Sequence, residues 1–155
     1  MAGPGTTFSG PVLTGTKKDA DGNGPANTGL CILTQQVTLN ANGTNAVTAS
    51  VVLPYGSQIV QFYADTLTAW NSLTSDTLTV GTAAAGSQYV GAVSTATAGR
   101  AAITYSAAQL LAMSNIGANT TVYATVTPVG SAATTGQTLV TIIYAQTVQL
   151  TQGAA

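Results

Sequence analysis

The amino-acid sequence predicts an all-β protein: a β-sandwich of about eight strands, for which a jelly roll is one candidate form, with one short helix and an extended N-terminal arm. Three observations support this fold class. Thr and Val, which favour strands, are abundant along the chain. The 17 glycines and the Asn- and Ser-containing segments supply turn signals at roughly 8–15-residue spacing. No segment repeats at a fixed period, which disfavours propellers and solenoids.

The first thirty residues differ from the rest of the chain. They are rich in Gly and Pro and show no strand or helix periodicity. Four of the seven charged residues lie there: Lys17, Lys18, Asp19 and Asp21. We therefore expect an extended arm at 1–30 and a β-sandwich domain at 31–155. Two interpretations of the arm are open: a loosely held terminus, or a segment that becomes ordered on a partner or a neighbouring subunit.

The strands are predicted from alternating runs that end at turn residues. These runs lie at 31–39, 46–53, 57–65, 76–81, 88–93, 100–105, 119–129 and 137–150. The first run is followed by Asn42-Gly43, a dipeptide typical of tight turns. In the fourth run Leu78 and Val80 alternate with threonines, so we expect these two residues to face the core.

The last two runs give the clearest expectations about facing and pairing. We expect them to pair with one another across the loop Gly130–Gly136, while the order of the other strands is not predicted. Residues of these runs expected to face the core are Val122, Ala124, Val126, Leu139, Ile143 and Val148.

One short helix is predicted between the sixth and seventh runs. Ser106 and Gln109 match a capping box, in which each side chain satisfies a backbone N–H at the helix start. Apolar residues follow at 110–113, and Gly117 is expected to end the helix. We expect it to close one end of the sandwich.

The shortage of charge excludes several classes of function. Charged residues make up 5% of the chain, against about one quarter in an average soluble domain, and there is no His and no Glu. Three cations cannot form the basic face that nucleic acid requires, so we expect no nucleic-acid partner. No apolar run approaches the roughly 20 residues of a membrane span and no signal peptide is visible, so we expect no membrane partner. Cys31 is the only cysteine, which excludes an intramolecular disulfide, and we interpret it as a small buried apolar residue.

Catalytic and metal-binding patterns are incomplete. With no His, neither a Ser-His-Asp nor a Cys-His arrangement can form, and zinc lacks ligands. Asp65 and Asp76 flank one loop and would be the carboxylate pair of a hydrolase, but turn capping or pairing with Arg100 is the favoured interpretation. The run Asp19–Gly24 matches the first half of a calcium loop, whereas its twelfth position is Leu30 rather than Glu. We expect no catalytic residue, no cofactor and no metal.

Trp70, in a polar loop between two strands, has two interpretations. It is either a lid over the core, which is favoured, or an anchor at a protein interface, where Trp is enriched. The apolar residues of the arm are the other candidates for contact with a partner. The predicted contact residues are Phe8, Pro11, Val12, Leu13 and Trp70.

Several short phrases of the sequence are similar to those of small virion proteins of tailed bacteriophages. The main phrases lie between Leu53 and Gly81: Leu53-Pro54-Tyr55-Gly56, Trp70-Asn71 and Ser75-Asp76-Thr77-Leu78. Others are Thr7–Pro11, Gly99-Arg100, Val122–Pro128 and Thr141–Tyr144. Together they cover most of the chain, which resembles the head decoration, or capsid cement, proteins. The resemblance implies repeated oligomers on the outside of an icosahedral shell, and it transfers no ligand residue.

On this basis we expect a structural virion protein, not an enzyme, that binds the outer surface of a capsid and reinforces it by non-covalent contacts. Its expected partners are the major capsid protein and neighbouring copies of itself, as a dimer or trimer. A nearly neutral surface suits crowded copies, because repulsion is small and adhesion is little screened by salt. One alternative is a head-fibre or tail module that binds the host surface or carbohydrate, for which Trp70 and Tyr55 are the candidate aromatic rings. The others are a carboxylate-pair hydrolase and a secreted bacterial surface domain.

Overall fold

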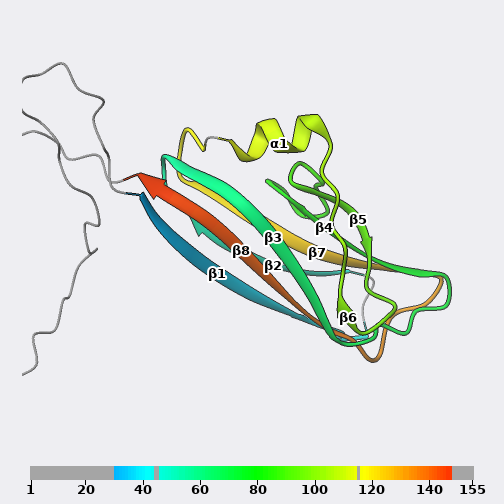
Figure 1. Cartoon of the computed structure of the whole chain (residues 1–155). Coiled ribbons are helices and arrows are strands. Elements are labelled where there is room, and N and C mark those ends of the chain that lie inside the picture. Colours follow the sequence, from blue (N-terminus) through cyan, green and yellow to red (C-terminus); the bar gives the residue numbers. More distant parts are fainter. Residues whose placement is uncertain (1–29, 44–45, 115, 148–155) are drawn as a thin grey trace, which may run out of the picture.

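The structure, a computed structural model, describes residues 30–43, 46–114 and 116–147. They form two four-stranded antiparallel sheets packed as a sandwich, with one short helix at the side (Figure 1). The elements are β1 (Leu30–Asn40), β2 (Val47–Leu53), β3 (Ser57–Thr68), β4 (Ser75–Gly81), β5 (Val90–Ser94), β6 (Gly99–Arg100), α1 (Ala107–Met113), β7 (Thr120–Val129) and β8 (Gln137–Thr147). The predicted all-β sandwich is confirmed, while residues 1–29 of the predicted arm lie outside the described residues and Leu30 begins β1.

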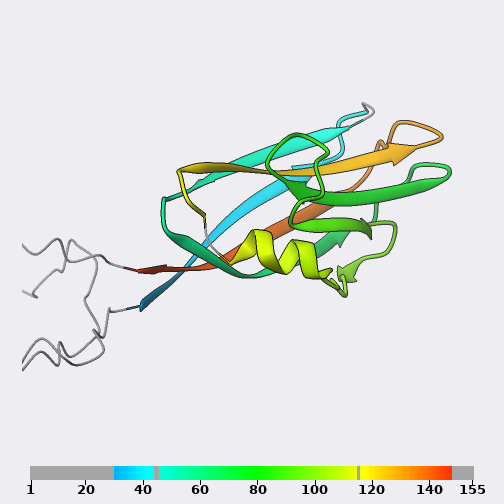
Figure 2. The ribbon, with the colours of Figure 1, turned by 90° about the horizontal axis from the view of Figure 1, so that it is seen from above.

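The strand order identifies the sandwich as a jelly roll. Sheet A has the order β1-β8-β3-β6, and sheet B has the order β2-β7-β4-β5. The chain therefore forms four nested antiparallel pairs, β1 with β8, β2 with β7, β3 with β6, and β4 with β5, which is the double Greek key of a jelly roll. Among the described strands, β4 and β5 are the only consecutive ones that pair, and the other connections pass between the two layers seen in Figure 2.

The predicted pairing of the last two strands is wrong for this reason. β7 lies between β2 and β4 in sheet B, whereas β8 lies between β1 and β3 in sheet A. The connection between them crosses the sandwich, and Gly130 and Gly136 stand at its two ends with φ values of 94° and 150°. A short connection usually joins neighbouring strands, but here the positive φ values turn the chain out of one sheet and into the other.

The core lies between the sheets, and the predicted facing is confirmed for β4 and β7 but not for β8. Leu78 and Val80 of β4 and the three predicted residues of β7 are buried. In β8 the prediction is wrong, because Val140, Ile142 and Tyr144 face the core while Leu139 and Ile143 face outward. β8 is apolar at both odd and even positions, so its alternation could not decide which face is buried. Val148 lies outside the described residues.

The predicted strand at 100–105 is reduced to the two residues of β6. Ala101 N–H still donates to Ala64 O (2.9 Å), but the next backbone donor of β3, Phe62 N–H, binds the Tyr105 hydroxyl (3.1 Å). A side chain thus takes the place of a strand carbonyl, and the ladder ends. The segment remains beside β3 without pairing as a strand.

The helix α1 begins as predicted, with the complete capping box. Gln109 N–H donates to Ser106 Oγ (3.3 Å), and Ser106 N–H donates to Gln109 Oε1 (2.8 Å). The helix ends earlier than expected, because Ser114 is its C-cap and its hydroxyl donates to Leu111 O. α1 packs beside β3 and sends Met113 into the core, so it covers one side of the sandwich, where β6 is too short to do so (Figure 1).

Candidate interaction surface

The outer face of sheet A is the candidate interaction surface. Apolar β8 residues run along its middle between polar residues of β1 and β3. In the register of the sheet the rows are Thr34–Ile143–Gln61, Gln36–Thr141–Tyr63 and Thr38–Leu139–Asp65. A bulge in β3 also places Val60 beside Gln61 on this face, and both are exposed. The result is an apolar centre bordered by hydrogen-bonding groups, of which Asp65 alone is charged.

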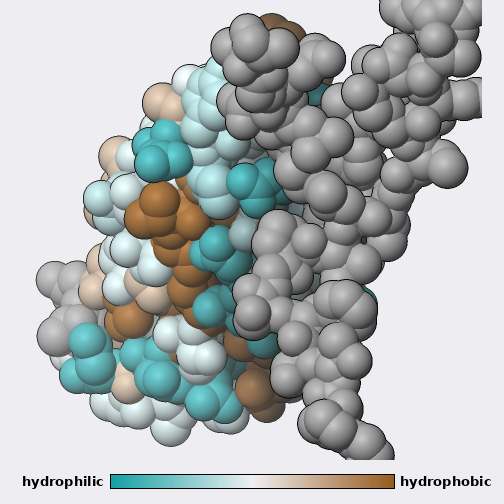
Figure 3. Space-filling model, turned by 90° about the vertical axis from the view of Figure 1, so that its left-hand side faces the viewer, coloured by the Kyte–Doolittle hydropathy of each residue, from teal (hydrophilic) through white to brown (hydrophobic). Residues whose placement is uncertain are grey.

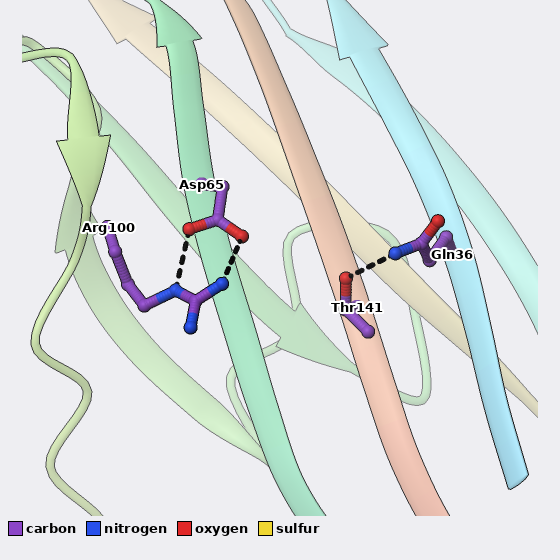
Figure 4. Close-up of polar contacts among 4 residues, drawn as sticks. All are labelled: Gln36, Asp65, Arg100 and Thr141. Carbon is purple, nitrogen blue, oxygen red and sulfur yellow. Dashed lines mark hydrogen bonds and ion pairs between the residues drawn. The ribbon is translucent and has the colours of Figure 1, made fainter.

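The polar contacts between β1 and β8 on this face run within the sheet, and Leu139 and Ile143 between them are half-buried. Gln36 of β1 donates to Thr141 Oγ1 of β8 (3.0 Å), and Gln137 of β8 donates to Asn40 Oδ1 of β1 (2.8 Å). Figure 4 shows the first of these bonds beside the Asp65–Arg100 ion pair. On the side where β1 begins and β8 ends, apolar residues also gather in a band bordered by hydrophilic ones (Figure 3).

One ion pair closes the β6 edge of this face. Arg100 donates from Nε to Asp65 Oδ1 (2.7 Å) and from a terminal nitrogen to Asp65 Oδ2 (2.9 Å). Its guanidinium also lies over the Tyr63 ring, with Cζ 4.2 Å from the ring centroid. The bidentate bond to Arg100 lowers the pKa of Asp65 below its ordinary value of 3.8. The pair is therefore ionised and mutually neutralised at neutral pH.

The outer face of sheet B is partly covered by the segment 82–88. Ala85 N–H donates to Thr125 Oγ1 (3.0 Å), and the same hydroxyl bonds with Thr48 (3.0 Å). The threonines of this face thus bond to one another and to the covering loop. Of the two outer faces, sheet A offers the more open apolar surface.

The described residues carry only three charged side chains: Asp65, Asp76 and Arg100. Asp76 is 2% exposed and accepts from Ser72 N–H through Oδ2 (3.2 Å), while its Oδ1 has no hydrogen-bond partner among the described residues. The described surface therefore presents one self-neutralised pair and no other exposed charge.

The two carboxylates considered for catalysis do not engage one another. Asp65 points to the outer face of sheet A and binds Arg100, while Asp76 is buried in β4 of sheet B. The predicted pairing with Arg100 is confirmed for Asp65. No group of three or more metal-ligating side chains occurs within 30–43, 46–114 and 116–147, and Asp19–Gly24 lies outside these ranges.

Trp70 belongs to the core. It is 3% exposed, its Nε1 donates to Thr138 Oγ1 (2.9 Å), and its N–H donates to Thr95 O (3.1 Å). The lid interpretation fits this geometry, so we leave Trp70 out of the interaction surface. Tyr55, the other aromatic considered for a sugar site, is 63% exposed at the β2–β3 turn. The two aromatics do not form a common groove.

The remaining predicted contact residues lie outside the described part of the chain: Phe8, Pro11, Val12 and Leu13. The sequence reasoning missed the outer-face residues Leu139, Ile143 and Gln61. Their signal was present in β8, where apolar residues occupy both alternating sets, as expected for a strand with one face in the core and the other in an apolar surface.

The comparisons with known proteins add no family to these observations. No family model, no curated protein and no solved structure matches the chain. Within its described part, the chain has no helix long and apolar enough to cross a membrane.

We expect the free energy of unfolding to change little between about pH 5 and pH 8, since the chain has no His. Below this range the contribution of the Asp65–Arg100 pair to the free energy of unfolding is lost as pH falls through the lowered pKa of Asp65.

At alkaline pH two tyrosines act in the opposite direction. Burial raises the pKa of Tyr89 and Tyr105 above 10.0, so they keep their protons in the folded state after the unfolded chain has lost them. Stability therefore falls as pH rises above 10.0. Urea unfolding at a series of pH values measures this, and a large step between about pH 5 and pH 8 would contradict it.

Proposed function

We propose that this protein is a structural virion protein that binds the outer surface of a tailed-phage capsid and reinforces it by non-covalent contacts. The sequence resemblance to head decoration proteins suggests the role, and one observation of the folded body carries it. Apart from the Asp65–Arg100 pair, the described surface is uncharged. A body of this kind can be packed in many adjacent copies without like-charge repulsion.

The proposed partner is the major capsid protein, and the proposed contacts are the outer face of sheet A and the sequence-predicted arm. The sheet face offers Leu139 and Ile143 between rows of Thr and Gln, which suits an interface with an apolar centre and a polar border. The arm adds the apolar residues Phe8, Val12 and Leu13. A jelly roll is also a fold of viral capsid domains, which is an analogy at the level of the fold alone.

The alternative of a head-fibre or tail module that binds carbohydrate has less support from the geometry. Sugar recognition usually uses exposed aromatic rings in a groove. Trp70 is buried, so Tyr55 is the only one of the two candidate rings that is exposed. A glycan array with the purified protein tests this alternative directly.

Capsid binding can be tested with capsids prepared without the protein, by co-sedimentation at low and high salt. We expect occupancy by the full chain to be nearly independent of salt, because the proposed contacts are apolar and hydrogen-bonded. Deletion of residues 1–25 should reduce occupancy, with circular dichroism confirming that the sandwich remains folded. Full occupancy after the deletion would remove the arm from the contact, and a steep loss of binding with salt would overturn the neutral-surface mechanism.

A matched pair of arginine substitutions separates the two sheet faces. Gln61→Arg places a charge on the outer face of sheet A, and Ser50→Arg places one on the outer face of sheet B at a position that is also exposed. An unpaired charge buried in the interface should weaken binding by at least about tenfold for the first variant and leave the second unchanged. If both variants bound capsids as tightly as the wild-type chain, the outer face of sheet A would not contact the shell.

A further inference from the structure

The β1–β2 side of the sandwich is incompletely covered. β1 and β2 are the edge strands of the two sheets, and they lie side by side along one margin (Figure 1). Leu39 and Leu53, at the ends of these strands, are fully buried, but the other core-facing apolar residues of β1 and β2 are only partly buried, whereas those of the central strands β7 and β8 are almost fully buried. The partly buried residues are Leu33 and Val37 of β1 and Val47, Ala49 and Val51 of β2. On the opposite side α1 and the segment 101–105 supply such a cover.

β1 also lacks the features that usually protect an edge strand. It is eleven residues long, pairs with β8 without a register shift, and contains no charge and no proline. Natural edge strands are usually short, bulged or charged, because an exposed ladder recruits other strands. The opposite edges follow this rule: β6 has two residues and carries Arg100, and β5 has five residues with a register shift against β4.

The edge of β2 is less available than that of β1. The Gln35 side chain of β1 donates to Val52 O of β2 (3.1 Å) and to the Tyr144 hydroxyl (3.1 Å). β1 therefore already uses a side chain to bind part of the β2 edge. The backbone groups of β1 that point away from β8 have no strand partner among the described residues.

We propose that β1 pairs antiparallel with β1 of a second copy of this chain, so that sheet A continues across a two-fold dimer. If the axis passes through Gln35, the middle residue of the strand, all eleven residues are paired. Leu33 of one copy then lies opposite Val37 of the other on the core side, and Thr34 lies opposite Gln36 on the outer side. The chemistry of the edge favours a second copy as the occupant: the pairing is isologous, joins apolar to apolar residues and brings no charges together.

The dimer is testable with the purified full chain, without capsids, so its failure is separate from failure of the proposed function. Sedimentation velocity over a wide concentration range should show a species of twice the 15.3 kDa chain mass. The double variant Thr34→Lys/Gln36→Lys places lysines opposite one another twice across the axis. We expect its dimer dissociation constant to rise at least about tenfold. The matched control is Gln58→Lys/Gln61→Lys, which adds the same charge to exposed β3 positions away from the axis and should leave the dimer intact.

Charge exchange gives the decisive readout. Thr34→Asp/Gln36→Asp alone should also dissociate, whereas an equal mixture of the lysine and aspartate variants should form the heterodimer, because opposite charges then face one another. A wild-type chain that stays monomeric at every concentration would overturn the pairing. So would a dimer that persists in the lysine variant, or one that is lost only when residues 1–25 are deleted.

Discussion

Replacing Trp70 with alanine should lower the free energy of unfolding by about 3–5 kcal/mol. The indole is 3% exposed and fills the core beside the connection from β7 to β8, so the truncation leaves a cavity that the two sheets cannot close. The substitution also removes the Nε1 donor to Thr138, whose buried hydroxyl then keeps only its long contact with Thr66 (3.3 Å). Stability is measured by urea unfolding followed by circular dichroism, since Trp70 is the only tryptophan of the chain.

One variant separates the packing of the ring from its hydrogen bond, and a second serves as a control. Trp70→Phe keeps an aromatic ring but loses the donor, so it should cost less than Trp70→Ala. Leu73→Ala lies in the same β3–β4 connection at 83% exposure and should be nearly neutral. If Trp70→Ala were as mild as Leu73→Ala, Trp70 would not be the core residue that the structure shows.

Much of the fold could be predicted from the sequence, because strand alternation and helix capping depend on residues that are near one another in the chain. Alternation in β4 and β7 identified the buried faces correctly, and the Ser106–Gln109 capping box identified the start of α1. The pairing of strands is not local. The connections of a jelly roll pass from sheet to sheet, so closeness in sequence misleads for β7 and β8. The Tyr105 hydroxyl, which interrupts the β6 ladder, is likewise a long-range contact that periodicity does not contain.

The candidate surface was harder to predict from the sequence than the fold. Its outline depends on Leu139 and Ile143 facing outward, and only the burial of Val140 and Ile142 decides this. The shortage of charge, in contrast, follows directly from the composition. The structure adds which of the few charged side chains are exposed and which are paired. Asp65 and Arg100 neutralise one another and Asp76 is buried. The exposed charges of the described surface are therefore those of one ion pair.

Gly136→Ala should destabilise the protein by about 2–5 kcal/mol, for two separable reasons. The residue has φ 150°, a conformation that L-residues with a side chain rarely adopt. In addition, a Cβ at this position would lie 2.5 Å from Trp70 Cδ2 and 2.6 Å from Trp70 Cγ. Gly99→Ala is the control for the first reason, because Gly99 also has a positive φ of 126° but has no atom within 4 Å of the added Cβ. It should show the backbone cost alone, about 1–3 kcal/mol.

A double-mutant cycle isolates the second reason. In a Trp70→Ala background the indole atoms that oppose the added Cβ are gone, so Gly136→Ala should cost about 1–3 kcal/mol less than it does in the wild type. The remaining cost should then match that of Gly99→Ala. An equal cost of Gly136→Ala in both backgrounds would show that the ring does not pack on Gly136. It would leave the positive φ as the reason for a glycine at the point where the chain crosses from sheet B into β8.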